Sequence, residues 1–217
     1  VAGDLHGLNT LEHQPMKVAA MEGPFESYDR AAPLILFGIP DSDAEVVHYQ
    51  VAGPGLGSLI VNHDIDAGID GLDTVAREDR PPVGIVFWSF RIMVGLGFLM
   101  VALGLWSLWS RWRKSLYENR WLHRFALAMS PAGFVAVIAG WITTEVGRQP
   151  WVIYGVMRTE DAVSAIDAPA VGASLTAFVI VYFLVFGAGT LYLLKLMRQP
   201  PAQGDAAAAS GPIRSAG

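Results

Sequence analysis

The sequence FALAMSPAGFVAVIAGWITTEVGR, residues 125–148, decides the fold of this chain. From Phe125 to Thr144 no residue is charged, and about 20 apolar residues are enough to cross a bilayer as a helix. This span runs into Glu145 and Arg148, which are three residues apart and so share one helical face. A carboxylate at membrane depth is costly unless it is paired or coordinates something. The cluster therefore predicts either an interfacial ion pair or a functional site.

The composition of the chain is that of a membrane protein. Of its 217 residues, 53% are hydrophobic and only 16% are charged. Because there is no cysteine, disulfides, zinc–thiolate sites and iron–sulfur clusters are excluded within this chain. A net charge of −5 argues against nucleic acid as a partner. Since the sequence opens on Val1 without a signal-peptide pattern, we expect it to be the back part of a longer protein.

Two more stretches are apolar enough to span a membrane. Residues 83–110 carry a single charge, Arg91, and residues 173–195 carry none until Lys195. Together with residues 125–147 they predict an all-α integral membrane region, 83–198, of three transmembrane helices. In the first span, Gly95 and Gly97 would permit close approach of a neighbouring helix.

The distribution of basic residues predicts the orientation of these helices. Residues 111–124 contain five Lys or Arg against one acid, and Lys195 and Arg198 follow the third span. By the positive-inside rule, residues 111–124 and the C-terminus are cytoplasmic. Residues 1–82 and 149–172 are then extracytoplasmic, and the three crossings alternate consistently.

The acidic segment 1–82 is expected to be mostly irregular, because it is rich in Gly and Pro. A short helix is expected to begin after Gly7, with Pro15 as an early break. The apolar run 33–40 is too short to cross a bilayer, so it predicts a buried strand, an interfacial segment or a site for an apolar ligand. At the other end, residues 199–217 are expected to form a disordered cytoplasmic tail.

The unusual residues of the spans are expected to gather at the outer face. Arg91 and Met93 lie two to three turns inside the first span, at the same side as Trp141, Glu145 and Arg148. Two arginines suit carboxylate or phosphate groups, including haem propionates. Met93 could ligate a haem iron, although a Met in an apolar helix usually packs in the core. Trp141 could belong to an aromatic belt or lie between redox centres.

A second candidate pair lies in the outer segment. Lys17 and Glu22 stand beside apolar residues in QPMKVAAMEG, residues 14–23. Such a pair could hydrogen-bond the two oxygens of a quinol and accept its proton. It could equally form a solvated helix face with a marginal ion pair.

Several of these motifs, in this order, resemble subunit I of cytochrome bd ubiquinol oxidase. Residues 3–23 and 36–41 resemble the quinol-binding outer loop of that family. FWSFRIMV, residues 87–94, and GWITTEVGRQPW, residues 140–151, are similar to its two later haem motifs. The resemblance runs from about residue 3 to residue 198.

The resemblance implies a terminal oxidase of the bacterial inner membrane that oxidises quinol at the outer face and reduces dioxygen to water. It implies a low-spin haem b bound by Met93 with Arg91 beside it, and a high-spin haem b bound by Glu145. Trp141 matches an aromatic residue between haems, and Arg148 matches an arginine that contacts a haem. The third group is haem d or a further haem b.

The resemblance also implies that Lys17 and Glu22 take part in the oxidation of ubiquinol or menaquinol within the quinol loop, residues 1–82. Expected partners are subunit II of the oxidase, a small single-span subunit and membrane lipid. The family subunit has about nine spans, so the histidine ligands of its low-spin haem and haem d are expected in earlier spans. We therefore expect this chain alone to be inactive.

Two alternatives remain open from the sequence. One is the cyanide-insensitive branch of the same family, which uses only haem b. The other is a haem-free membrane anchor or assembly subunit, in which Met93 and Glu145 are structural.

Overall fold

The structure is a computed structural model, and it describes residues 2–163 and 166–198. Its contacts divide the chain into two compact units, of which the first ends at Val163. Each unit is described by itself. The expected disordered tail, residues 199–217, lies outside the described residues.

The N-terminal segment contains more regular structure than its Gly and Pro content predicts. Two helices, α1 (Ala2–His13) and α2 (Pro15–Glu22), are followed by an antiparallel hairpin of β1 (Leu34–Asp41) and β2 (Val46–Gly53), and then by α3 (Leu56–Asn62). Two single-turn 3-10 helices complete it, η1 (Leu72–Thr74) and η2 (Arg77–Asp79). The expectation of a mostly irregular segment is corrected in this respect. Short helices and strands, separated by turns, form here without a long periodic run of apolar residues.

The details of this segment differ from the sequence-based expectations. The first helix begins before Gly7 rather than after it, and the chain breaks at Gln14 before Pro15 opens α2. Proline suits that position because its missing N–H has no partner in the first turn of a helix. The apolar run 33–40 forms most of a strand that is buried only in part, with Ile35 4% exposed and Leu36 58% exposed.

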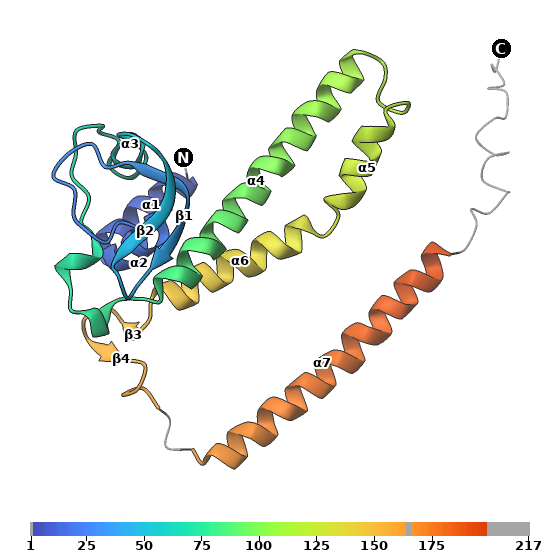
Figure 1. Ribbon diagram of the computed structural model, residues 1–217. Helices are drawn as coiled ribbons and strands as arrows, with labels where there is room; N and C mark the ends of the chain where they lie inside the picture. Colours follow the sequence, from blue (N-terminus) through green and yellow to red (C-terminus); the bar gives the residue numbers. More distant parts are fainter. Residues whose placement is uncertain (1, 164–165, 199–217) are drawn as a thin grey trace, which may run out of the picture. The chain divides into compact units, whose positions relative to one another are not determined.

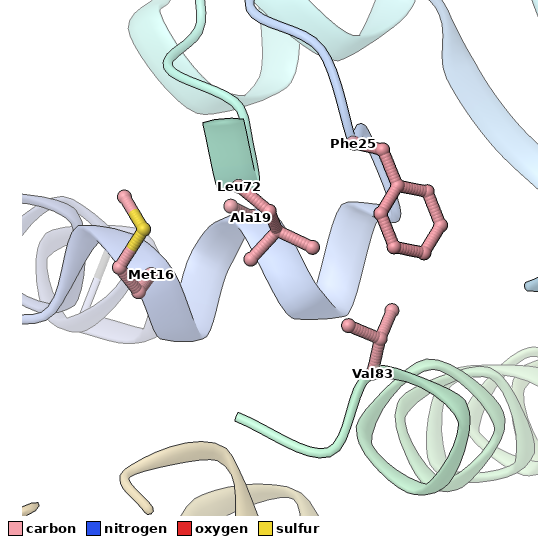
Figure 2. Packing of buried hydrophobic residues seen from close by; sticks show 5 residues of the cluster. All are labelled: Met16, Ala19, Phe25, Leu72 and Val83. Atoms are coloured by element: carbon pink, nitrogen blue, oxygen red, sulfur yellow. The ribbon is translucent and has the colours of Figure 1, made fainter. Parts of the chain in front are cut away.

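A small hydrophobic core joins the outer segment to the first membrane helix. Figure 2 shows its members, which come from α2, the following loop, η1 and the start of α4: Met16, Ala19, Phe25, Leu72 and Val83. Leu72 is fully buried and Ala19 is 1% exposed. Burying a side chain such as Leu or Phe contributes roughly 1.5–3 kcal/mol. This core therefore fixes α2 against the first turn of α4.

The first two spans form a helical hairpin. α4 (Val83–Trp112) packs along α6 (Ala132–Gly147), and the shorter α5 (Arg120–Ala128) leads from one to the other (Figure 1). The Asn119 side chain caps α5 by accepting hydrogen bonds from the backbone N–H groups of Trp121 and Leu122, both at 3.2 Å. Proline has no N–H to donate to the carbonyl four residues earlier, and the expected span 125–147 is interrupted at Met129–Pro131.

A second, short hairpin lies at the end of the helical hairpin where α4 begins and α6 ends. β3 (Trp151–Ile153) and β4 (Met157–Arg158) follow α6 and pair antiparallel. Arg158 Nη2 lies 2.5 Å from Asp79 Oδ1 in η2, just before α4. The contact links the segment before α4 to the segment after α6.

The second unit contains the long helix α7 (Ala168–Met197). Within the described ranges, three helical stretches are long and apolar enough to cross a membrane, Arg77–Trp112, Arg120–Gly147 and Ala168–Met197. The predicted all-α membrane fold with three such helices is therefore confirmed.

Candidate functional site

A cavity of about 740 Å³ lies between the two N-terminal helices and the α4–α6 pair. Lys17, Met21 and Glu22 line it from α2, while Phe90 and Met93 line it from α4. The cavity is also lined by Gly140, Thr143 and Thr144 of α6 and by the exposed residues His6 and His13 of α1. The structure thus brings the two groups of residues singled out in the sequence, the loop pair and the span methionine, to one cavity.

Glu22 is a buried carboxylate at the end of α2. Its residue is 7% exposed, and its Oε2 atom has no hydrogen-bond partner among the described residues. Burial raises the pKa of Glu22, and the positive charge of Arg91 opposes that rise. A carboxyl group with a raised pKa in a cavity can take up a proton closer to neutral pH than an exposed one.

Lys17 lies against the end of α6. Its residue is 8% exposed, and a Cβ atom added at Gly147 would lie 3.0 Å from Lys17 Cγ, so the stem of the lysine runs over this glycine. Burial lowers the pKa of Lys17, the neighbouring Arg148 lowers it further, and Glu145 opposes both. Lys17 therefore connects the α2 pair electrostatically with the Glu145–Arg148 cluster.

Arg91 holds the outer segment by its backbone. Its Nη1 atom donates to Met21 O at 2.8 Å and to Phe87 O at 3.1 Å. Its Nη2 atom donates to Glu22 O at 3.3 Å and also to Ile35 O. The guanidinium lies over the Phe87 ring, with Cζ 3.2 Å from the ring centre. Two of these carbonyls belong to the last turn of α2, where a cation is favoured.

The approach of α2 to α4 depends on Gly23. This residue ends α2 in the left-handed conformation, with φ 95°, and its N–H donates to Ala19 O at 2.8 Å. A Cβ atom there would lie 2.7 Å from the Phe87 ring. Glycine is therefore required both by the backbone conformation and by the close contact.

Met93 packs into a notch on α6. A Cβ atom added at Gly140 would lie 2.7 Å from Met93 Sδ. One turn away, the buried hydroxyls of Ser89 and Thr143 are hydrogen-bonded across the two helices at 2.9 Å. By contrast, no described atom lies within 4 Å of a Cβ added at Gly95 or Gly97, so the expected close approach at those glycines is not found.

The Glu145–Arg148 pair of the opening sequence forms an ion pair. Arg148 Nη2 lies 2.5 Å from Glu145 Oε2, and the two side chains are 42% and 41% exposed. Trp141 is 66% exposed and does not line the cavity. Of the seven predicted site residues, three line the cavity (Lys17, Glu22 and Met93), while Arg91 braces its wall and Glu145 and Arg148 flank Lys17.

The donor set can be compared with what haem requires. The thioether of Met93 at the cavity wall suits a haem iron, and the carboxylate of Glu145, which is paired with Arg148, is a hard oxygen donor. Among the described residues no three His, Asp or Glu side chains are grouped to hold a metal ion. Met93 and Glu145 would therefore each supply one ligand to a haem iron.

The family follows from comparison with known proteins. Residues 1–201 match the family of cytochrome bd terminal oxidase subunit I, and the chain belongs to this family.

Individual relatives agree with this assignment. The chain is 34% identical over 209 residues to cytochrome bd ubiquinol oxidase subunit 1 of Bacillus subtilis, which covers 92% of this chain and 44% of that protein. It is 27% identical to cytochrome bd-II ubiquinol oxidase subunit 1 of Escherichia coli, covering 92% of this chain and 51% of that protein. The structure of bd oxidase from Geobacillus thermodenitrificans matches with a TM-score of 0.73 and 34% identity, covering 92% of this chain and 45% of that one. The chain thus spans about half the length of the relatives it matches.

Sequence reasoning did not identify the glycines that shape the site. Gly23, Gly140 and Gly147 each lie where a Cβ atom would come within 3.0 Å of a side chain, namely Phe87, Met93 and Lys17 respectively. Gly140 and Gly147 are seven residues apart, two turns along one face of α6, and this spacing was the available signal.

Proposed function

We propose that this chain forms part of the haem-bearing subunit of a bd-type terminal quinol oxidase, which oxidises membrane quinol and reduces dioxygen to water. The observation that carries the proposal is the buried, unpartnered carboxylate of Glu22 in one cavity with Lys17 and Met93. Family membership supports it, as do relatives named as ubiquinol and menaquinol oxidase subunits. A volume of about 740 Å³ lies within the usual range of small-molecule sites.

The proton chemistry is assigned to the α2 pair. Oxidation of a quinol to a quinone releases two electrons and two protons. The carboxylate of Glu22 accepts the proton of one quinol hydroxyl, and its raised pKa makes it a stronger base than an exposed glutamate. The proton of the other hydroxyl passes to water on the outer side. The ammonium of Lys17 donates a hydrogen bond to the other quinol oxygen, and the stem of Lys17 on Gly147 restricts where that bond can form.

The haem ligands are assigned to α4 and α6. When bound, the haems supply the one-electron acceptors for quinol and the iron at which dioxygen is reduced. We assign Met93 to a low-spin haem b and Glu145 to a high-spin haem b, with Arg91, Trp141 and Arg148 beside them. The third group is haem d or, in the cyanide-insensitive branch, a further haem b. Pigment extraction and the long-wavelength haem d band distinguish these two cases.

The proposed setting is the bacterial cytoplasmic membrane. Residues 1–82 form the extracytoplasmic quinol loop and residues 83–198 the membrane region, with residues 111–124 and the C-terminus in the cytoplasm. Proposed partners are subunit II of the oxidase, a small single-span subunit, membrane lipid and quinol. The acidic outer segment and the basic residues around 111–124 support this orientation.

Replacing Glu22 with Gln tests the quinol site. In the complete oxidase, Glu22→Gln should lower the quinol kcat by roughly 10²–10⁴-fold, because the amide cannot accept the proton. Glu12→Gln is the matched control, since Glu12 is exposed on α1 and does not line the cavity. Equal turnover of the Glu22→Gln variant and the wild type would refute the proposed base.

Replacing Met93 with Leu tests haem binding separately. Leucine keeps the apolar volume but has no sulfur to ligate iron. The reduced-minus-oxidised spectrum of the complete protein should lose its low-spin haem b signal. An unchanged low-spin signal would reject Met93 as the ligand, whereas a wild-type protein without any haem signal would favour the haem-free anchor.

A further inference from the structure

The position of the Met93 sulfur is set by α6 rather than by its own helix. At Gly140 a Cβ atom would lie 2.7 Å from Met93 Sδ and 3.8 Å from Met93 Cγ. Non-bonded heavy atoms are at their optimum near 3.5–4.0 Å, so only the Cα hydrogens of a glycine leave room for the sulfur. Gly133, on the same helix, has no described atom within 4 Å of an added Cβ.

A buried polar contact fixes the two helices one turn away from this notch. Ser89 is four residues before Met93, and Thr143 is three residues after Gly140, so each lies on the same face as its neighbour. Their hydroxyl oxygens are 2.9 Å apart, with the residues 7% and 4% exposed. Ser89 Oγ also lies 3.1 Å from Val86 O, and Thr143 Oγ1 lies 2.9 Å from Ala139 O. The two hydroxyl protons can fill two of these three contacts at a time, so the hydrogen bond between the helices shares a proton with one of the contacts inside a helix.

We propose that Gly140 and the Ser89–Thr143 hydrogen bond form a seat on α6 that positions the Met93 thioether as a haem ligand. Because Gly140 has no side chain, it leaves room for the Met93 sulfur against α6. The hydroxyl pair fixes the register of α4 along α6. These three are positioning residues, since they act on the haem through Met93. The inference rests on the proposed function through the assignment of Met93.

The experiment measures the low-spin haem b spectrum and its midpoint potential in the complete oxidase. Gly140→Ala should displace Met93 Sδ, so that the low-spin signal is reduced or its midpoint potential falls, because methionine ligation raises the potential. The high-spin haem b signal should persist. Gly133→Ala makes the same substitution in open space on the same helix and should match the wild type in both readouts.

A second pair of variants tests the hydroxyl contact without adding volume. Thr143→Val removes the hydroxyl and should lower the low-spin midpoint potential, while Thr143→Ser keeps the hydroxyl and should restore the wild-type value. A Gly140→Ala spectrum and potential equal to those of the wild type, or an equal loss of both haem signals, would overturn the seat.

The Met93→Leu variant distinguishes a failure of the ligand assignment from a failure of the seat alone. If Met93→Leu leaves the low-spin signal intact, the ligand assignment in the proposed function fails. If Met93→Leu removes the signal and Gly140→Ala leaves spectrum and potential unchanged, only the seat fails.

Discussion

At the scale of single residues, the chemistry of the site depends on burial more than on residue type. Glu12 and Glu22 are both glutamates near the N-terminus, but only Glu22 is buried with an unpartnered oxygen. Isolated from water, its charged form loses hydration, and the pKa rises. The structure therefore distinguishes one glutamate from the other by its surroundings.

The pH dependence of quinol oxidation follows from this raised pKa. The base form of Glu22 is present above its pKa, so kcat/KM for quinol should fall as the pH decreases through this pKa, which burial raises above that of an exposed glutamate. Glu22→Gln should remove this acidic limb from the residual activity. Steady-state rates across pH, on the wild type and this variant, check the prediction.

Other groups around the carboxyl need their own control. Arg91 faces Glu22 from α4, and Lys17, His6 and His13 line the same cavity. Both histidines are exposed, unlike Glu22, so a variant with His6→Gln and His13→Gln should keep the acidic limb. If the limb disappears with the histidines and remains in Glu22→Gln, Glu22 is not the group that titrates.

At the scale of elements, Arg91 ties the outer segment to α4. A guanidinium is a planar fork that reaches several acceptors at once, whereas an ammonium is a point charge. Arg91→Lys should lose some of the bonds to Met21 O, Glu22 O and Ile35 O, each worth roughly 1.5–3 kcal/mol for a charged donor.

The expected result is a loosened α2. Amide hydrogen exchange in residues 15–23 should be faster in Arg91→Lys, and the KM for quinol should rise. Arg30→Lys is the control, because Arg30 belongs to an exposed pair with Asp66. Unchanged exchange in α2 would show that the hydrophobic core around Leu72 holds this helix without the arginine.

The elements also show what the sequence can and cannot predict. The three apolar spans were predictable because a helix in lipid must satisfy its own backbone and be apolar along its length. The second span was predicted as one helix over residues 125–147, but the structure has a break before Pro131, with α5 and α6 as separate helices. The contact of Gly140 with Met93 was not predictable, because it depends on how α4 and α6 are placed against each other.

The candidate site divides in the same way. Met93, Glu145, Lys17 and Glu22 were chosen from unusual residue types and from the family resemblance. The grouping of Lys17, Glu22 and Met93 at one cavity requires the tertiary contacts of α2 with α4 and α6. The carbonyl partners of Arg91 were also not predictable, because every residue has a backbone carbonyl and the sequence does not indicate which ones accept its hydrogen bonds.

At the scale of the whole molecule, the absence of cysteine allows a direct test of orientation. Single cysteines at the exposed positions Ser42, Glu118 and Asp161 would report on the outer segment, the loop 111–124 and the loop 149–172. Ser42→Cys and Asp161→Cys should react with a membrane-impermeant maleimide in intact cells. Glu118→Cys should react only after permeabilisation, and its labelling in intact cells would contradict the proposed topology.

The Arg91 contacts also bear on how the protein is made. The three outer-segment carbonyls that receive its hydrogen bonds lie 70, 69 and 56 residues earlier in the chain. A ribosome therefore completes these acceptors before it adds the arginine. On the proposed topology, the acceptors are already across the membrane when α4 enters, and an arginine that insertion would otherwise penalise meets its partners as it arrives. Deleting the early segment should consequently impair the insertion of α4 itself.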